Sequence, residues 1–287
     1  MRLQNCKYVI ASGTTGRFAG CDLLAHSEMS DLYCLWNCGF YSNEFQVFSS
    51  LLTLANHGIV PERVDYSLGY RHFKKNPEQD IYLDFHQIDE SVEINLYPNI
   101  EIPDPNKYQN RLYNFKIYNK IRDRFFPPSE IIRERKKFLI EKYNINPEKT
   151  ISVLYRGTDK GSEVRLSPPE NYLKVVVDLL EKNPDFKVLL QTDQTQVIHF
   201  FNNELENKLI TFQETPSTTS NRVIWSLMEE NGNDSIDWSK WFDAALRCVS
   251  ECKYLVNHTG NVAFFANLYR GNINNVYQFN EQGVLVC

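Results

Sequence analysis

The 287-residue sequence lacks any apolar run of the roughly 18 residues that a membrane-spanning helix needs. It also lacks a basic excess, because its formal net charge is -5 at pH 7 and its 31 lysines and arginines are not pooled. Its first residues hold too short an apolar stretch for a signal peptide. Seven cysteines form no dense framework, which favours a reducing compartment. These absences predict no membrane span, no nucleic-acid partner and a cytoplasmic location.

Motifs that hold metal ions are also missing. Cys34 and Cys38, like Cys248 and Cys252, are four residues apart, but neither pair has a nearby set of histidine or cysteine partners. The sequence contains no Asp-x-Asp motif. We therefore expect buried, unmetallated cysteines and a function that uses no metal ion.

What the sequence does have is an alternation of apolar strands and amphipathic helices after residue 150. Strands are expected at 151–155, 186–191, 209–212, 254–258 and 275–279, and helices at 169–182, 239–251 and 261–269. Continuous apolar strands separated by helices predict a parallel sheet covered on both faces, which is a doubly wound, Rossmann-like α/β domain.

The first half is less regular. We expect strands at 7–11 and 31–36, a glycine-containing loop at 13–20 and a helix at 44–57. A polar, tyrosine-rich stretch follows at 76–128, and a connecting helix is expected at 129–143. The chain is long enough for two α/β domains, which we place at 1–128 and 129–287.

Three of the predicted strands end in polar clusters. Arg156 begins the first cluster, Asp193 ends the second, and Asn257 to Asn261 form the third. In open α/β sheets, ligands bind outside the carboxyl ends of the strands. An arginine binds phosphate with two parallel hydrogen bonds, and a helix that starts near Gly260 offers backbone N–H groups to the same anion. The clusters predict a ligand that carries a diphosphate; the alternative is that Arg156 only pairs with a neighbouring aspartate.

The segments "VLYRGTDKGSE", "VLLQTD" and "ECKYLVNHTGNVAFFANL" resemble the donor-binding half of GT-B fucosyltransferases of the α1,6, α1,2 and protein O-fucosyltransferase types. The resemblance covers residues 150–270. It implies a GT-B fold, in which two Rossmann-like domains face a cleft. It also implies inverting, metal-independent transfer of a sugar, L-fucose from GDP-fucose, to a hydroxyl group of a glycan. The partners would then be a nucleotide sugar and a glycan acceptor, with no bound cofactor.

The resemblance also implies roles for individual residues. Arg156 matches the arginine that grips the donor diphosphate, and Glu163 lies close to the acidic residue proposed as catalytic base. The candidate donor-binding residues are Arg156, Thr158, Asp159, Lys160, Thr192, Asp193, Asp243, His258, Thr259, Gly260 and Asn261. Leu154 stands where the family has histidine, and Gly157 where the α1,6 enzymes have a second arginine. A different nucleotide sugar therefore stays open as the donor.

The segment "WNCGFYSNEF", at 36–45, is the candidate acceptor-side loop. Glycine allows close approach of the backbone to a ligand, and polar side chains supply hydrogen bonds. The candidate residues are Asn37, Gly39, Phe40, Ser42 and Asn43. The alternative is an ordinary loop in which Ser42 caps the following helix.

Two other functions remain as alternatives. Gly13, Gly16 and Gly20 follow the first strand in the manner of a dinucleotide-binding loop, which would suit an NAD(P)-dependent reductase or epimerase. However, no acidic residue ends the next strand, and the only Tyr-x-x-x-Lys motif, at Tyr70, comes too early for such an enzyme. The second alternative is a GT-B module that binds a glycan or nucleotide without turnover.

Overall fold

The computed structural model describes residues 8–11, 31–95, 98–100, 102–105, 115–158, 160–162, 164–230 and 234–286. It divides the chain into two compact units. Unit 1 comprises Met1–Pro103 and Asn114–Ile131, and unit 2 comprises Asp104–Tyr113 and Ile132–Cys287. The predicted glycine loop at 13–20 lies outside the described residues.

Unit 1 contains a parallel sheet in the order β1-β2-β3. The strands are β1 (Tyr8–Ala11), β2 (Asp31–Cys34) and β3 (Arg63–Asp65), and the helices are α1 (Phe40–Asn56), the 3-10 turn η1 (Arg71–Phe73), α2 (Tyr82–Phe85) and α3 (Phe115–Phe125). Helix α1 is buried along most of its length, and its Phe48 ring packs edge to face with the Tyr118 ring of α3, with 5.3 Å between the ring centres. Helices α1 and α3 therefore share an aromatic contact in the core.

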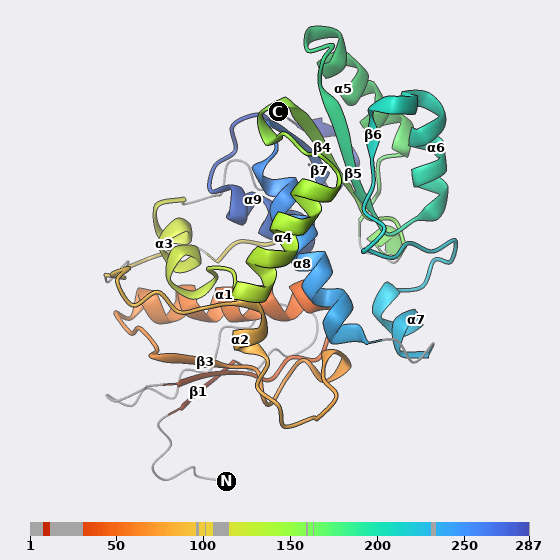
Figure 1. Ribbon diagram of the computed structural model, residues 1–287. Coiled ribbons are helices and arrows are strands. Elements are labelled where there is room, and N and C mark those ends of the chain that lie inside the picture. Colours follow the sequence, from red (N-terminus) through yellow and green to blue (C-terminus); the bar gives the residue numbers. More distant parts are fainter. Residues whose placement is uncertain are drawn as a thin grey trace. The chain divides into compact units, whose positions relative to one another are not determined.

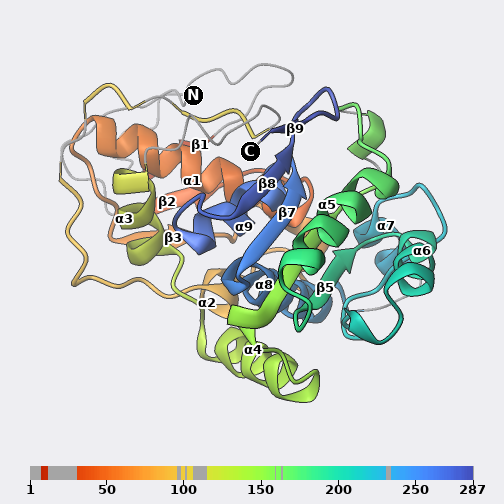
Figure 2. The same cartoon turned by 90° about the horizontal axis from the view of Figure 1, so that it is seen from above.

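Unit 2 contains a six-stranded sheet in the order β6-β5-β4-β7-β8-β9. Figure 1 labels β4, β5, β6 and β7 of this sheet. The strands are β4 (Thr150–Tyr155), β5 (Lys187–Thr192), β6 (Leu209–Ile210), β7 (Tyr254–His258), β8 (Val276–Phe279) and β9 (Leu285–Val286). All neighbouring pairs are parallel except β8 and β9. Figure 2 shows β7 and β8 side by side with their arrowheads at the same end.

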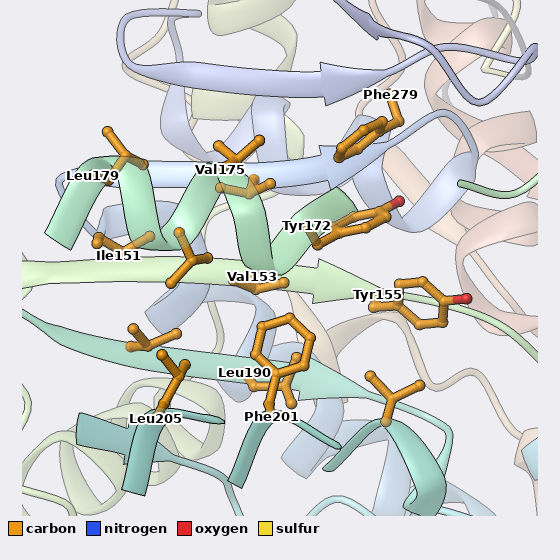
Figure 3. Packing of buried hydrophobic residues seen from close by; sticks show 14 residues of the cluster. Ile151, Val153, Tyr155, Tyr172, Val175, Leu179, Leu190, Phe201, Leu205 and Phe279 are labelled. Atoms are coloured by element: carbon orange, nitrogen blue, oxygen red, sulfur yellow. The ribbon is translucent and has the colours of Figure 1, made fainter. Parts of the chain in front are cut away.

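The remaining helices are α4 (Glu130–Lys142), α5 (Pro169–Lys182), α6 (Thr195–Leu205), α7 (Ile224–Glu230), α8 (Ser235–Glu251) and α9 (Asn261–Arg270), with short 3-10 turns η2 (Pro147–Lys149), η3 (Lys160–Ser162) and η4 (Glu206–Lys208). Helices α5 and α6 pack against one face of the sheet, and α8 packs against the other. Figure 3 shows Ile151, Val153 and Tyr155 on the face of β4 that packs against α5 and α6. On the opposite face, the hydroxyl of Ser152 donates to the backbone carbonyl of Val249 in α8. Alternate residues of β4 thus pack on opposite faces of the sheet, and both faces are buried, which explains its continuous apolar sequence.

The predicted doubly wound parallel sheet is confirmed for the second half of the chain. The helix predicted at 169–182 matches α5, and the connecting helix predicted at 129–143 is α4. Helices α2, α3, α6 and α7 and strands β3 and β9 were not predicted, and α1 begins at Phe40 rather than at residue 44.

Candidate functional site

The carboxyl ends of β5, β4 and β7 lie next to one another, because these three strands are adjacent and parallel. The polar clusters that follow them therefore share one edge of the unit 2 sheet. We call this edge, formed by residues 156–160, 192–194 and 257–261, the rim.

Asp193 organises the loop that follows β4. Its carboxylate accepts hydrogen bonds from the backbone N–H of Gly157 (2.9 Å) and from the hydroxyl of Thr158 (2.7 Å). It also forms an ion pair with Nε of Arg156 at 3.4 Å. The Arg156 side chain is 29% exposed. The predicted Arg156–Asp193 pair therefore exists, and it orients the guanidinium at the rim instead of burying it.

His258 connects the end of β7 to the end of β4. The backbone N–H of Arg156 donates to Nε2 of His258 at 3.2 Å, and Nδ1 forms a short hydrogen bond with the carbonyl of Thr259. Burial, followed by the positive charges of Lys160 and Arg156, lowers the pKa of His258 to about 3. The imidazole is therefore neutral, and both ring nitrogens have partners within the protein. In the structure His258 is a positioning residue for the Arg156 backbone.

The side chain of Lys160, a residue of η3, lies against the start of α9. It is only 4% exposed, and a Cβ added to Gly260 would come within 2.8 Å of its Cε and 3.1 Å of its Nζ. Gly260 has φ +134°, a conformation that other residues rarely adopt, and its carbonyl accepts the N–H of Phe264 at 2.8 Å. The first N–H groups of a helix have no partner within the helix and carry a partial positive charge. A lysine at this end adds to that charge, so the place favours an anion.

Thr259 adds a buried hydroxyl to the rim. Its backbone N–H donates to the carbonyl of Phe279 at 3.1 Å, and the residue is 0% exposed. Among the described residues, no group forms a hydrogen bond with its Oγ1. Thr192 lies at the end of β5, where its Oγ1 accepts the N–H of Gln194 at 3.2 Å. Asn261 is the first residue of α9.

Two candidates lie outside the described residues. Asp159 and the proposed base Glu163 fall there, so their roles stay predictions. The chain after them passes close to Gly283, where an added Cβ would lie 3.0 Å from the carbonyl oxygen of Arg165. The backbone N–H of Arg165 also donates to the carbonyl of Glu281 at 3.1 Å.

Asp243 is buried between α8 and α9. One carboxylate oxygen accepts from Nε of Arg247 at 2.9 Å, and the other accepts from the hydroxyl of Tyr269, also at 2.9 Å. The guanidinium of Arg247 lies 3.9 Å from the centre of the Tyr269 ring. This network joins the two helices, and we leave Asp243 out of the proposed donor site.

Leu154 and Gly157, the two positions at which the sequence differs from the motif that it resembles, lie in β4 and just after it. Leu154 is buried in β4, where it pairs with Gln191 of β5. At Gly157, an added Cβ would lie 2.2 Å from Oε1 of Gln194. Any larger residue at 157 would therefore displace the Gln194 side chain.

Sequence reasoning missed the loop that follows β6. The N–H of Thr218 donates to the carbonyl of Asp193 at 2.9 Å, and the N–H of Thr195 donates to the carbonyl of Thr218 at 3.0 Å. The hydroxyls of Thr195 and Ser217 are 2.9 Å apart. The Ser- and Thr-rich sequence at 215–220 was the available signal that this loop is polar, but nothing in it indicated contact with β5.

In unit 1, two of the acceptor-side candidates brace their own loop. The Asn37 side chain accepts the N–H of Arg71 at 2.9 Å and donates to the carbonyl of Leu35 at 3.3 Å. Asn43 is fully buried, and its amide bonds to the N–H and the carbonyl of Cys38. Both amides therefore have internal partners.

The other three candidates begin α1. Gly39 is the N-cap residue and Phe40 the first residue of the helix. The Phe40 ring is buried, with its centre 4.4 Å from that of Phe85. Ser42 lies within α1, and its backbone N–H donates to the carbonyl of Gly39 at 2.9 Å. The alternative in which Ser42 is the N-cap residue is therefore wrong, because that position belongs to Gly39, and Phe40 belongs to the core.

Within the described ranges, no three histidine, cysteine or carboxylate side chains come together in a way that could hold a metal ion. None of the helices there has the length and apolar character that crossing a bilayer requires.

No family model matches the sequence, and no curated protein matches it. The fold is similar to that of NodZ α1,6-fucosyltransferase co-crystallised with GDP, with a TM-score of 0.53 and 14% identity over 90% of this chain and 97% of that chain. The structure of NodZ soaked with GDP-fucose gives a TM-score of 0.53 and 13% identity over 90% of this chain and 98% of that one. The structure of fucosyltransferase NodZ from Bradyrhizobium gives a TM-score of 0.52 and 13% identity over 90% of this chain and 97% of that chain. The predicted likeness to the fold of α1,6-type fucosyltransferases is confirmed.

Proposed function

We propose that this protein is an inverting, metal-independent glycosyltransferase that moves a sugar from a nucleoside diphosphate to a hydroxyl group of a glycan. Unit 2 would bind the donor and unit 1 the acceptor. GDP-fucose is the best candidate donor, because the fold resembles that of a fucosyltransferase crystallised with GDP and with GDP-fucose. GDP-fucose and the residue roles rest on this likeness together with the sequence motif.

One observation carries the proposal: a partly exposed arginine and a buried lysine lie at the edge of a parallel sheet where α9 begins. Arg156 is held by Asp193 at 3.4 Å, and Lys160 lies against Gly260. Two cationic side chains and a helix N-terminus stabilise a group with two or more negative charges. A diphosphate has this charge, and the carboxyl edge of a doubly wound sheet is where such ligands bind.

The chemistry follows from this arrangement. The acceptor oxygen attacks the anomeric carbon of the donor sugar while the bond from that carbon to the phosphate oxygen breaks. The nucleoside diphosphate leaves with the electron pair, and its charge is stabilised by Arg156 and the start of α9. The proton of the acceptor hydroxyl passes to a carboxylate base, for which Glu163 is the candidate.

Calorimetric titration with GDP, GDP-fucose and the corresponding UDP, dTDP and CDP compounds tests donor binding. Arg156→Ala should weaken binding of the preferred diphosphate at least tenfold, since hydrogen bonds to charged groups contribute about 1.5–3 kcal/mol. Arg133→Ala, which changes an exposed arginine of α4, is the matched control and should leave binding unchanged. Equal affinity of wild type and Arg156→Ala for every diphosphate would contradict the proposal.

The alternatives give different outcomes in the same experiments. Preference for a UDP, dTDP or CDP sugar would support a transferase with a different donor. The glycine at position 157, where the α1,6 enzymes have a second arginine, would be consistent with that outcome. Binding without any slow release of free sugar would favour a non-catalytic module. Binding of NAD(P) and of no nucleoside diphosphate would favour the reductase alternative.

A further inference from the structure

We propose that the side chain of Gln194 is a second recognition group at the rim, which hydrogen-bonds a hydroxyl group of the donor, and that Gly157 makes room for it. This inference rests on the proposed function, because it deepens the same site. Gln194 would contribute to the specificity for the donor and not to the stabilisation of the negative charge of the diphosphate.

The backbone of Gln194 is held firmly beside Asp193. Its N–H donates to Oγ1 of Thr192 at 3.2 Å, and its carbonyl accepts the N–H of Val197 at 3.2 Å as α6 begins. It also forms a parallel bridge with Thr218. The side chain therefore starts from a fixed point at the carboxyl end of β5.

The carboxamide lies directly on Gly157, next to Arg156. A Cβ at position 157 would come within 2.2 Å of Oε1, 2.5 Å of Cδ and 2.9 Å of Nε2 of Gln194. Gln194 is only 8% exposed. Across the ranges that the structure describes, its backbone groups are bonded and its carboxamide forms no hydrogen bond. Oε1 and Nε2 are not among the buried side-chain atoms that lack a partner, so the end of the side chain reaches solvent at the rim.

A polar group that reaches solvent binds water in the unbound protein and can exchange that water for a polar group of a ligand. A ligand at the rim would supply such a partner, since the carboxamide adjoins the residue that holds the diphosphate in the proposed site.

The chemistry of the amide indicates which group it binds. A carboxamide is neutral and both donates and accepts, so it matches a hydroxyl group, which also does both. Phosphate oxygens only accept, and Arg156 and Lys160 already provide positive charge for them. The hydroxyl belongs either to the ribose of the nucleoside or to the sugar that is transferred.

Titration of Gln194→Ala with GDP and with GDP-fucose tests the assignment. Loss of one neutral hydrogen bond should weaken binding about two- to tenfold, from the usual 0.5–1.5 kcal/mol. An equal loss for both compounds identifies a ribose hydroxyl, and a loss confined to GDP-fucose identifies the transferred sugar. Gln196→Ala, on the exposed side of α6, is the control and should bind both like the wild type.

A double-mutant cycle tests the role of Gly157. Gly157→Ala should displace only the flexible end of Gln194, so its affinity loss should equal that of Gln194→Ala. In a Gln194→Ala background, Gly157→Ala should cause no further loss, because the space is empty. Unfolding midpoints, measured in parallel, ensure that each variant is folded.

Two results would overturn the inference alone: wild-type affinity of Gln194→Ala for both compounds, or additive losses in the double variant. A wild-type protein that binds no nucleoside diphosphate would overturn the proposed function together with this inference.

Discussion

The backbone N–H of Arg156 donates a hydrogen bond to Nε2 of His258 across the ends of β4 and β7, at 3.2 Å. The two residues are 102 positions apart in the sequence. Arg156 has the largest role in the proposed site, and the position of its backbone depends on a neutral histidine of another strand. A protonated imidazole would have no acceptor for this N–H and would place a positive charge beside Arg156 and Lys160.

The stability of the protein should therefore depend on the charge of His258. Its pKa is lowered from 6.5 to about 3, chiefly by burial. Because the folded protein holds the neutral form, this contribution is complete above pH 6.5 and is lost as the pH falls towards 3. His258→Gln keeps an acceptor near the position of Nε2 but does not titrate. The difference in unfolding midpoint between wild type and His258→Gln should thus shift in favour of the variant between pH 7.5 and 4.5. Parallel curves would contradict the prediction.

Glu163→Gln should separate chemistry from donor binding. If Glu163 accepts the proton of the acceptor hydroxyl, the amide cannot replace it, and transfer should fall at least a hundredfold. The Kd for GDP should stay close to that of the wild type, because the base contacts the acceptor. Single-turnover transfer and titration with GDP measure the two effects. Near-normal turnover would show that another group is the base.

Thr259→Val should change binding without loss of stability. The hydroxyl of Thr259 is buried and has no hydrogen-bond partner among the described residues, so a methyl group of the same size is tolerated in the unbound protein. If this hydroxyl binds the diphosphate, affinity for GDP should fall on the order of tenfold. Thr259→Ser retains the hydroxyl and serves as the control. An unchanged Kd in Thr259→Val would remove Thr259 from the site.

Gly260→Ala should destabilise unit 2 by about 1–3 kcal/mol, because the residue has φ +134° and its Cβ would press on Lys160. The matched control is Gly161→Ala. There the nearest atom to an added Cβ is Cδ1 of Leu166, at an ordinary 3.8 Å, and the expected change is within about 0.5 kcal/mol. Urea unfolding measures both variants. Equal urea midpoints for Gly260→Ala and Gly161→Ala would mean that the start of α9 can accommodate a side chain at position 260.

The elements that were predicted well are those whose local pattern agrees with their tertiary role. Helix α5 places Tyr172, Val176 and Leu179 on one buried face, and this spacing is visible in the sequence. Helix α6 was missed although Val197, Phe201 and Leu205 are also spaced four apart. Its threonine, valine, isoleucine and asparagine residues have low helix propensity, so packing against β5 decides its structure.

The sequence alone determined that unit 2 is a parallel α/β sheet and that three polar clusters follow its strands, since both depend on residue order and periodicity. It could not determine the direction in which each polar side chain points. Only the tertiary structure places Asp193 under the loop of Arg156, turns His258 inward, encloses Asp243 between two helices and lays Gln194 on Gly157. These outcomes depend on contacts between residues that are distant in the chain. A local sequence pattern does not specify which distant residues the fold will bring next to a given side chain.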